Sequence, residues 1–172
     1  MEQAELRALV DEAMKRTALV WLSFAGSDRA WPVWHVWDGA AAYVVSAGRE
    51  QRLDGIERAE RVVVTARAKD SRERLVSWVA EPVVLEPRSD DWRAAVELLR
   101  AERLNATQGD ALLDVWAEQS TVTRLTPTGE TTERPGAYPD DSLAAAPVES
   151  PATTTGKLPW VVHRRAGRAP RL

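Results

Sequence analysis

Apolar residues near the start of the chain recur at helical spacing, and those that follow recur at strand spacing. Residues 2–16 carry an apolar stripe with a period of about 3.6, which predicts an amphipathic helix. The next segment, 17–25, is apolar at consecutive positions, as in a strand that is covered on both faces. Runs of β-branched and aromatic residues predict further strands over 30–37, 41–47, 61–67 and 74–86.

Local signals indicate how some of these segments begin, end or join. Asp38 and Gly39 stand between two predicted strands and are typical of a hairpin turn. The segment 49–59 has the apolar spacing of a short helix. Pro82 is expected at a bulge or an edge position of its strand, because proline cannot donate a backbone hydrogen bond.

The last part of the predicted domain contains two helices and a final strand. Ser89 is a good N-cap for a helix over 90–104, and apolar spacing predicts a second helix over 110–118. The segment 120–126 has strand character, and Pro127 and Gly129 are expected to end it. Hairpin-linked strands with few helices favour a mainly β (α+β) fold, an antiparallel barrel with peripheral helices.

Composition changes near residues 130–135. Six of the ten prolines lie in 135–172, and the stretch 142–155 is rich in Ala, Pro, Thr and Ser. Such a segment has too few large apolar side chains to form a core of its own. We therefore expect a folded domain over 1–134 and an extended, basic C-terminal tail over 135–172.

Composition also excludes several kinds of protein. The 172 residues include no cysteine and two histidines, which excludes a disulfide scaffold and argues against a metal site. The longest uncharged run has eleven residues, too short for a membrane span, and the acidic N-terminal segment does not resemble a secretory signal. We therefore expect a cytoplasmic protein. The formal charge is −8 over residues 1–156 and +5 over the rest, which argues against a nucleic-acid partner.

The most informative segment is WPVWHVWDGAAAYVVSAGREQR, residues 31–52. Together with RAKDSRERL, STVTRLTPTGE and the later PGAYPDDS and SPATTTGKLPW, it resembles the flavin-binding split-barrel superfamily. That group includes the pyridoxamine 5′-phosphate oxidases and the flavin/deazaflavin oxidoreductases. Within it, the chain is similar to small oxidase-like proteins of high-GC actinobacteria. The resemblance implies a split β-barrel over nearly the whole chain, with FMN as the expected cofactor and a deazaflavin coenzyme or haem as alternatives.

The resemblance also implies a set of cofactor-binding residues. Ser46 matches the hydroxyl that ends the third strand, and Arg52 matches the basic residue that binds the flavin phosphate with it. A phosphate there would gain a cation and the dipole of the helix predicted over 49–59. The backbone of the preceding strand would lie along the isoalloxazine ring. The expected set is Val33, Trp34, His35, Ser46, Arg49, Arg52, Arg67 and Lys69.

Some residues depart from that pattern or have simpler explanations. Glu50 would repel a phosphate if its side chain pointed inward. No counterpart of the substrate-binding Arg and His of true pyridoxamine-phosphate oxidases is found, which argues against pyridoxal phosphate synthesis. Ser46 and Arg52 also fit an ordinary strand end and a solvated cation, and His35 fits a buried core histidine. The tryptophans of 31–37 fit either core and dimer contacts or a stacking surface for a cofactor.

Two functions therefore stay open at this point. One is a flavin-dependent oxidoreductase of a small molecule, in which the cofactor carries the chemistry because no acid or base stands out in the sequence. The other is a non-catalytic protein that binds flavin, deazaflavin or haem on the same fold. In either case the apolar faces of 17–25 and 30–37 predict a homodimer.

Overall fold

The structure is a computed structural model that describes residues 3–27, 29–69, 73–103 and 111–138. Its order of elements is helix, four strands, a short 3-10 helix, two strands, two helices and a long last strand. The bounds are α1 Gln3–Arg16, β1 Leu19–Phe24, β2 Trp31–Trp34, β3 Val36–Trp37, β4 Ala42–Ser46, η1 Ile56–Arg58, β5 Val62–Arg67, β6 Arg74–Val84, α2 Asp90–Glu102, α3 Ala111–Gln119 and β7 Thr121–Glu133.

The strands form one antiparallel sheet with the order β2-β1-β5-β6-β7-β4-β3. The two strands at its ends, β2 and β3, are consecutive in the chain and are separated only by His35. The sheet therefore curls until its first and last strands meet, nearly closing into a barrel. This confirms the antiparallel barrel with peripheral helices. The split of the barrel lies at His35, between the end of β2 and the start of β3.

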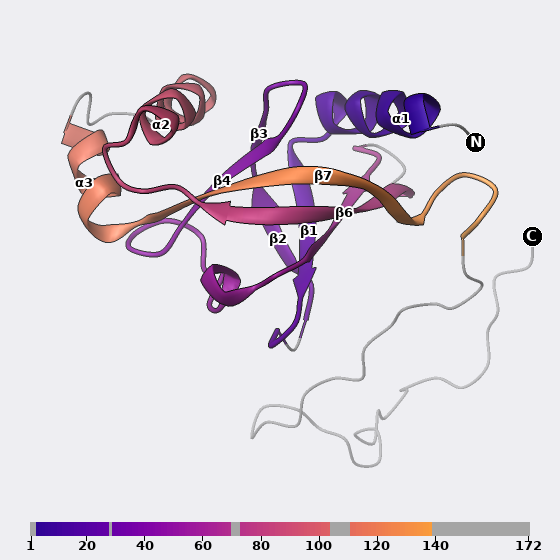
Figure 1. Ribbon diagram of the computed structural model, residues 1–172, viewed down its shortest axis with the longest axis horizontal. Coiled ribbons are helices and arrows are strands. Elements are labelled where there is room, and N and C mark those ends of the chain that lie inside the picture. The colour runs from indigo at the N-terminus through magenta and orange to yellow at the C-terminus, as the bar shows by residue number, and fades with distance from the viewer. Residues whose placement is uncertain (1–2, 28, 70–72, 104–110, 139–172) are drawn as a thin grey trace, which may run out of the picture. The chain divides into compact units, whose positions relative to one another are not determined.

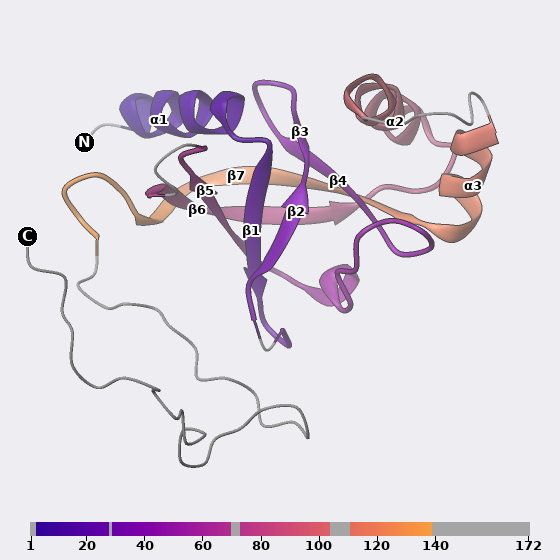
Figure 2. The ribbon, with the colours of Figure 1, turned by 180° about the vertical axis from the view of Figure 1, so that it is seen from behind.

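The helices lie at opposite ends of the long β6–β7 ribbon (Figures 1 and 2). At one end α1 covers the barrel core, which is built around Trp78, Leu22, Val44 and Met14. At the other end α2 and α3 pack on β3, β4 and β7, where Trp116, Trp92 and Leu99 form a second apolar cluster. The helix α1 and the pair α2–α3 thus pack on different parts of the sheet. Among the residues that the structure describes, no helix is long and apolar enough to span a bilayer.

Three sequence predictions were wrong, each for a tertiary reason. The strand expected over 30–37 breaks at His35, because its halves pair with different neighbours, β1 and β4. The helix expected over 49–59 is reduced to the single 3-10 turn η1. The strand expected to end before Pro127 continues to Glu133.

The continuation of β7 depends on a bulge. Pro127 pairs with Ala80 and Thr131 pairs with Trp78, so three residues of β7 oppose the single residue Val79. Gly129 has a φ of +86°, a conformation that glycine adopts without strain. Pro82 agrees better with its prediction. It pairs with β7 but lies beyond Ala80, where the pairing of β6 with β5 ends, so its β5 side is an edge.

Candidate functional site

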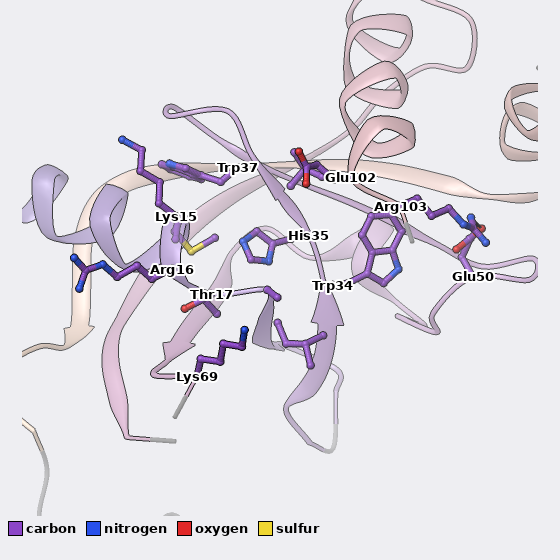
Figure 3. A pocket seen from close by; sticks show the side chains of 14 residues that line it. Lys15, Arg16, Thr17, Trp34, His35, Trp37, Glu50, Lys69, Glu102 and Arg103 are labelled. Carbon is purple, nitrogen blue, oxygen red and sulfur yellow. Dashed lines mark hydrogen bonds and ion pairs between the residues drawn. The ribbon is translucent and has the colours of Figure 1, made fainter. Parts of the chain in front are cut away.

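A cavity of about 830 Å³ opens beside the split of the barrel. Its wall is formed by the end of α1 with the residues that follow it, by the β2–β3 break, and by the end of α2. Single residues come from the loop after β4 and the loop after β5. Figure 3 shows His35 near the middle, with Thr17 and Lys69 to one side of it and Trp34, Arg103 and Glu50 to the other. The full lining is Met14, Lys15, Arg16, Thr17, Ala18, Leu19, Trp34, His35, Val36, Trp37, Glu50, Lys69, Glu102 and Arg103.

His35 is buried in this wall, with only 9% of its surface exposed, as is the neighbouring polar residue Thr17. Burial lowers the pKa of His35 to about 4, and the hydrogen bond from its ring to the backbone of Met14 offsets only part of that effect. The ring is therefore neutral near pH 7. Its Nδ1 atom is buried and has no hydrogen-bond partner. A buried polar atom left without a partner costs about 1–3 kcal/mol.

The cations of the wall differ in how far they are neutralised. Lys15 lies 2.6 Å from Asp11, and Arg16 lies 2.5 Å from Glu12, each one helical turn earlier on α1. The Lys15 ammonium, followed by the Trp37 indole, lowers the pKa of Asp11. Within the described parts of the chain, Lys69 has neither a hydrogen bond nor an ion pair. Lys69 is therefore the cation of the wall best placed to meet an anionic group of a ligand.

Glu50, the residue expected to oppose a phosphate, is neutralised inside the protein. Its carboxylate accepts a hydrogen bond from Arg103 and a second one, 2.8 Å long, from the indole N–H of Trp116. The Arg103 guanidinium also lies 5.6 Å from the centre of the Trp116 ring. The Glu50 side chain is only 7% exposed. Arg103 and Trp116 thus stabilise the negative charge of Glu50. The repulsion of a phosphate that the sequence predicted for this residue is therefore largely compensated.

The loop that carries Glu50 also closes the edge of β2. The Gln51 side chain accepts a hydrogen bond from the backbone N–H of Trp34 and donates one to its carbonyl, both 2.9 Å long. Gly48 allows the loop to take this course. Its φ is +61°, and a Cβ there would lie 2.8 Å from the backbone oxygen of Gln119. The Trp34 backbone, expected to lie along the flavin ring, is therefore already occupied by Gln51.

The structure brings together three of the eight residues predicted to bind the cofactor. Trp34, His35 and Lys69 line the cavity. Arg67 lies at its margin, since its backbone carbonyl accepts a hydrogen bond from Thr17, a residue of the wall.

The other four predicted residues lie outside the lining. Val33 is part of the barrel core. Ser46 ends β4 as predicted and is 2% exposed. Arg49 is exposed, and Arg52 is an exposed residue that pairs with Asp54 at 2.7 Å. With the helix over 49–59 reduced to η1, no helix begins at Arg52, so the dipole expected for a phosphate there is absent from this described loop.

Several residues of the site were not predicted from the sequence. No local signal pointed to Gln51, Arg103 or Thr17, because each forms its hydrogen bond with a residue 17 to 53 positions away in the sequence. Lys15 and Arg16 carried a weak signal, since they form a basic last turn of a helix directly before a strand. The position of the helix end alone does not predict that these two residues lie beside the β2–β3 break. The order of the strands in the sheet must be known as well.

Known structures resemble this arrangement closely enough to identify the fold. The haem storage protein HutZ from Vibrio cholerae matches with a TM-score of 0.52 and 12% identity over 71% of this chain and 89% of HutZ. A protein from Bacteroides thetaiotaomicron, described as a 5-nitroimidazole antibiotic resistance protein, matches with a TM-score of 0.50 and 10% identity, over 74% of this chain and 80% of its own. The chain has a split β-barrel fold.

A third match is the conserved protein Rv2991 from Mycobacterium tuberculosis, with a TM-score of 0.51 and 18% identity over 74% of this chain and 81% of that protein. No protein-family model matches the sequence. A search of curated proteins also found no match. At these identities the comparisons establish the split-barrel fold alone, and the predicted membership of an actinobacterial subgroup stays a prediction.

Proposed function

We propose that this protein binds a flavin in the cavity beside the barrel split, FMN in the first place, and acts as a flavin-dependent oxidoreductase on a small molecule. The observation that carries the proposal is the make-up of the cavity wall. The wall combines two indoles, Trp34 and Trp37, with a neutral buried imidazole and Lys69, which has no ion-pair partner among the described residues. A flat aromatic ring with polar edges and a phosphate calls for these kinds of group.

The size of the cavity and its lining fit such a ligand. A volume of about 830 Å³ falls in the usual range for cofactor sites. Met14, Val36 and the indoles give apolar surface, and Lys69 lies at one side with a charge to offer a phosphate. A deazaflavin coenzyme has a similarly flat ring and is a variant of the same proposal. The Ser46–Arg52 phosphate site predicted from the sequence stays a prediction, since neither residue lines the cavity.

The protein's own contribution to a reaction would be binding and orientation. A bound flavin supplies hydride-transfer chemistry. His35 is not suited to donate a proton near neutral pH, because burial holds its pKa near 4. The acidic residues of the wall are Glu50, which is engaged by Arg103 and Trp116, and the exposed Glu102. Substrate protonation would then come from solvent or from the substrate itself. We do not extend the proposal to pyridoxal phosphate synthesis.

A non-catalytic haem-binding protein is the second candidate. One observation favours it: His35 is a neutral imidazole in the cavity wall, and the neutral imidazole is the form in which histidine ligates a metal. Lys69 could then pair with a haem propionate. Haem differs from flavin in that it would need the imidazole as a metal ligand, so the two candidates predict different spectra.

We further propose that the chain works as a homodimer in the cytoplasm. Leu19 supports the dimer, because it is 54% exposed on β1, a strand that is otherwise largely buried. Leu19 also belongs to the cavity wall. A second copy that covers Leu19 would therefore cover one rim of the cavity.

The test of the proposed function is a binding experiment on the purified full-length chain. FMN, riboflavin and haemin are each titrated, and the absorption and flavin fluorescence spectra are recorded. We expect FMN to bind with a micromolar Kd or better, corresponding to about 8 kcal/mol, and to lose fluorescence beside the indoles. Binding of haemin with an iron–imidazole spectrum and none of FMN would favour the second candidate. Binding of neither would overturn both.

A further inference from the structure

Two stretches of chain form most of the cavity wall. Ten of the fourteen lining residues belong to 14–19, the end of α1 with its connection to β1, or to 34–37, the break between β2 and β3. At one end the two stretches meet through strand pairing, where Leu19 of β1 lies opposite Trp34 of β2. The width of the cavity therefore depends on what holds the stretches together at their other end.

Asp11 of α1 makes that second connection. Its Oδ1 atom accepts a hydrogen bond of 2.9 Å from the indole N–H of Trp37, which crosses from the helix to β3. Its Oδ2 atom accepts one of 2.6 Å from the ammonium of Lys15, one turn later on α1. Both donors line the cavity, at the same end of the wall in Figure 3, whereas Asp11 lies outside the lining. One carboxylate behind the wall thus binds one residue of each stretch.

The sheet by itself gives Trp37 little support. The strand β3 consists of Val36 and Trp37 alone and lies at the end of the sheet, paired on one side with β4. So short a pairing contributes little stability. The Trp37 ring also packs edge-on against Trp78 of the barrel core, with the ring centres 6.1 Å apart and the planes at 65°. The bond to Asp11 is therefore the contact that fixes the N–H edge of the indole.

We propose that Asp11 is a positioning residue of the cavity: by tying Trp37 to the end of α1, it sets the separation of the two wall stretches and so the fit of a flat ring between them. This rests on the proposed function, since flavin is the ring concerned. Asp11 acts through Trp37 and touches no ligand atom. A site held in its binding geometry before the ligand arrives binds more tightly than one that is ordered only on binding.

Two substitutions of Asp11 separate its bond to Trp37 from its charge. Asp11→Asn keeps an oxygen that can accept from the indole and removes the negative charge, whereas Asp11→Ala removes both. Riboflavin is the ligand to use, because it has no phosphate on which the change of charge would act. We expect Asp11→Ala to weaken riboflavin binding at least tenfold, and Asp11→Asn to stay within threefold of the wild type. Equal losses in both variants, or no loss in either, would overturn the inference.

Two control variants separate this effect from helix charge and from general stability. Glu12 also pairs with a cation of the wall one turn later, Arg16 at 2.5 Å, but within the described residues it has no hydrogen bond to β3. Glu133→Ala removes a largely buried carboxylate that Arg74 and Ser77 bind outside the cavity lining, and so lowers stability alone. Glu12→Ala and Glu133→Ala should each leave riboflavin affinity within twofold. A tenfold loss in either control would overturn the inference.

A measurement on the wild type covers the case in which Asp11→Ala folds poorly. By linkage, a bond that favours binding is itself favoured by binding. In saturating riboflavin, the indole proton of Trp37 should therefore exchange with solvent at least threefold more slowly. The indole proton of Trp31, which is bonded to Ser27 at 2.8 Å outside the lining, should be unaffected. Unchanged exchange at Trp37 in a chain that binds riboflavin would overturn the inference and leave flavin binding intact. A wild type that binds no flavin would remove both.

Discussion

The carboxamide of Gln51 forms two hydrogen bonds with the backbone of Trp34, and so takes the part of a neighbouring strand at the split of the barrel. Trp34 is the last residue of β2, and its other side pairs with β1. A barrel that is not fully closed leaves an edge with unpaired backbone groups. Here a single side chain, from a loop more than a dozen residues later, satisfies that edge and borders the candidate site.

Replacing Gln51 should therefore destabilise the fold. We expect Gln51→Ala to lower the free energy of unfolding by about 1–3 kcal/mol, because it removes two hydrogen bonds and leaves the Trp34 backbone groups without their partner. Chemical denaturation measures the effect. Gln119→Ala is the matched control, since that exposed side chain lies at the end of α3, and it should change stability by no more than about 0.5 kcal/mol. Equal effects of the two substitutions would contradict this role of Gln51.

A second prediction concerns the buried charge of Glu50. Removing its carboxylate with Glu50→Ala leaves Arg103 and the Trp116 indole without an acceptor, and we expect a loss of about 3 kcal/mol in unfolding free energy. The same loop carries an exposed pair for comparison. Arg52 and Asp54 have side chains 76% and 66% exposed, so Asp54→Ala should cost at most about 0.5 kcal/mol. Equal losses of unfolding free energy in Glu50→Ala and Asp54→Ala would show that Glu50 does not stabilise the fold in this way.

The burial of neutral His35 predicts how stability depends on pH. Its pKa falls from 6.5 in the unfolded chain to about 4 in the folded protein. Since the folded value is the lower one, this contribution is fully present above pH 6.5 and is lost as the pH falls towards 4. The loss amounts to about 3 kcal/mol. The difference in stability between wild type and His35→Gln, measured from pH 8 to pH 4, should change by that amount. The two proteins share every other titratable group, so those contributions cancel in the difference, and parallel curves would contradict the assignment.

Much of the fold follows from local sequence, whereas its breaks do not. The helix that begins after Ser89 could be predicted because its cap and apolar stripe act within a few residues, and the Ser89 side chain indeed accepts a hydrogen bond from the backbone N–H of Trp92. The break at His35 could not, because the strand pattern of 30–37 continues through it. Only the pairing of β2 with β1 and of β3 with β4 shows that one extended segment serves two edges of the sheet.

The candidate site shows the same division. Trp34, His35 and Lys69 could be anticipated from the resemblance to a family, and the structure places all three on the cavity wall. The neutral state of His35 could not, since it depends on burial in the assembled fold, which outweighs the opposite effect of the Met14 backbone, 21 positions earlier. The pairing of Glu50 could not be predicted from the sequence either, because its partner Arg103 lies 53 positions later, at the end of α2. Residue types are readable locally, but their protonation and pairing are properties of the assembled fold.

The dimer proposal predicts that the oligomeric state depends on Leu19. Light scattering should give about twice the chain mass of 19.1 kDa at micromolar concentration. Leu19→Asp should shift the population to monomer, because it would bury a charge in the contact. Leu98→Asp serves as the control, since Leu98 is 39% exposed on α2, away from β1 and β2. A monomeric wild type, or equal effects of the two substitutions, would contradict the proposed contact.

The last prediction decides which cation meets the phosphate of FMN. The sequence favours Arg52, but this residue is paired with Asp54 and lies outside the cavity lining, whereas Lys69 lines the cavity and has no ion-pair partner among the described residues. A hydrogen bond to a charged group contributes about 1.5–3 kcal/mol. We therefore expect Lys69→Met to weaken FMN binding about tenfold or more, and Arg52→Met to weaken it less than threefold. Riboflavin, which has no phosphate, is the matched ligand, and its affinity should stay nearly constant in both variants. A selective loss of FMN binding in Arg52→Met alone would return the phosphate to the Ser46–Arg52 site. Equal losses for FMN and riboflavin in Lys69→Met would show that Lys69 shapes the cavity without binding the phosphate.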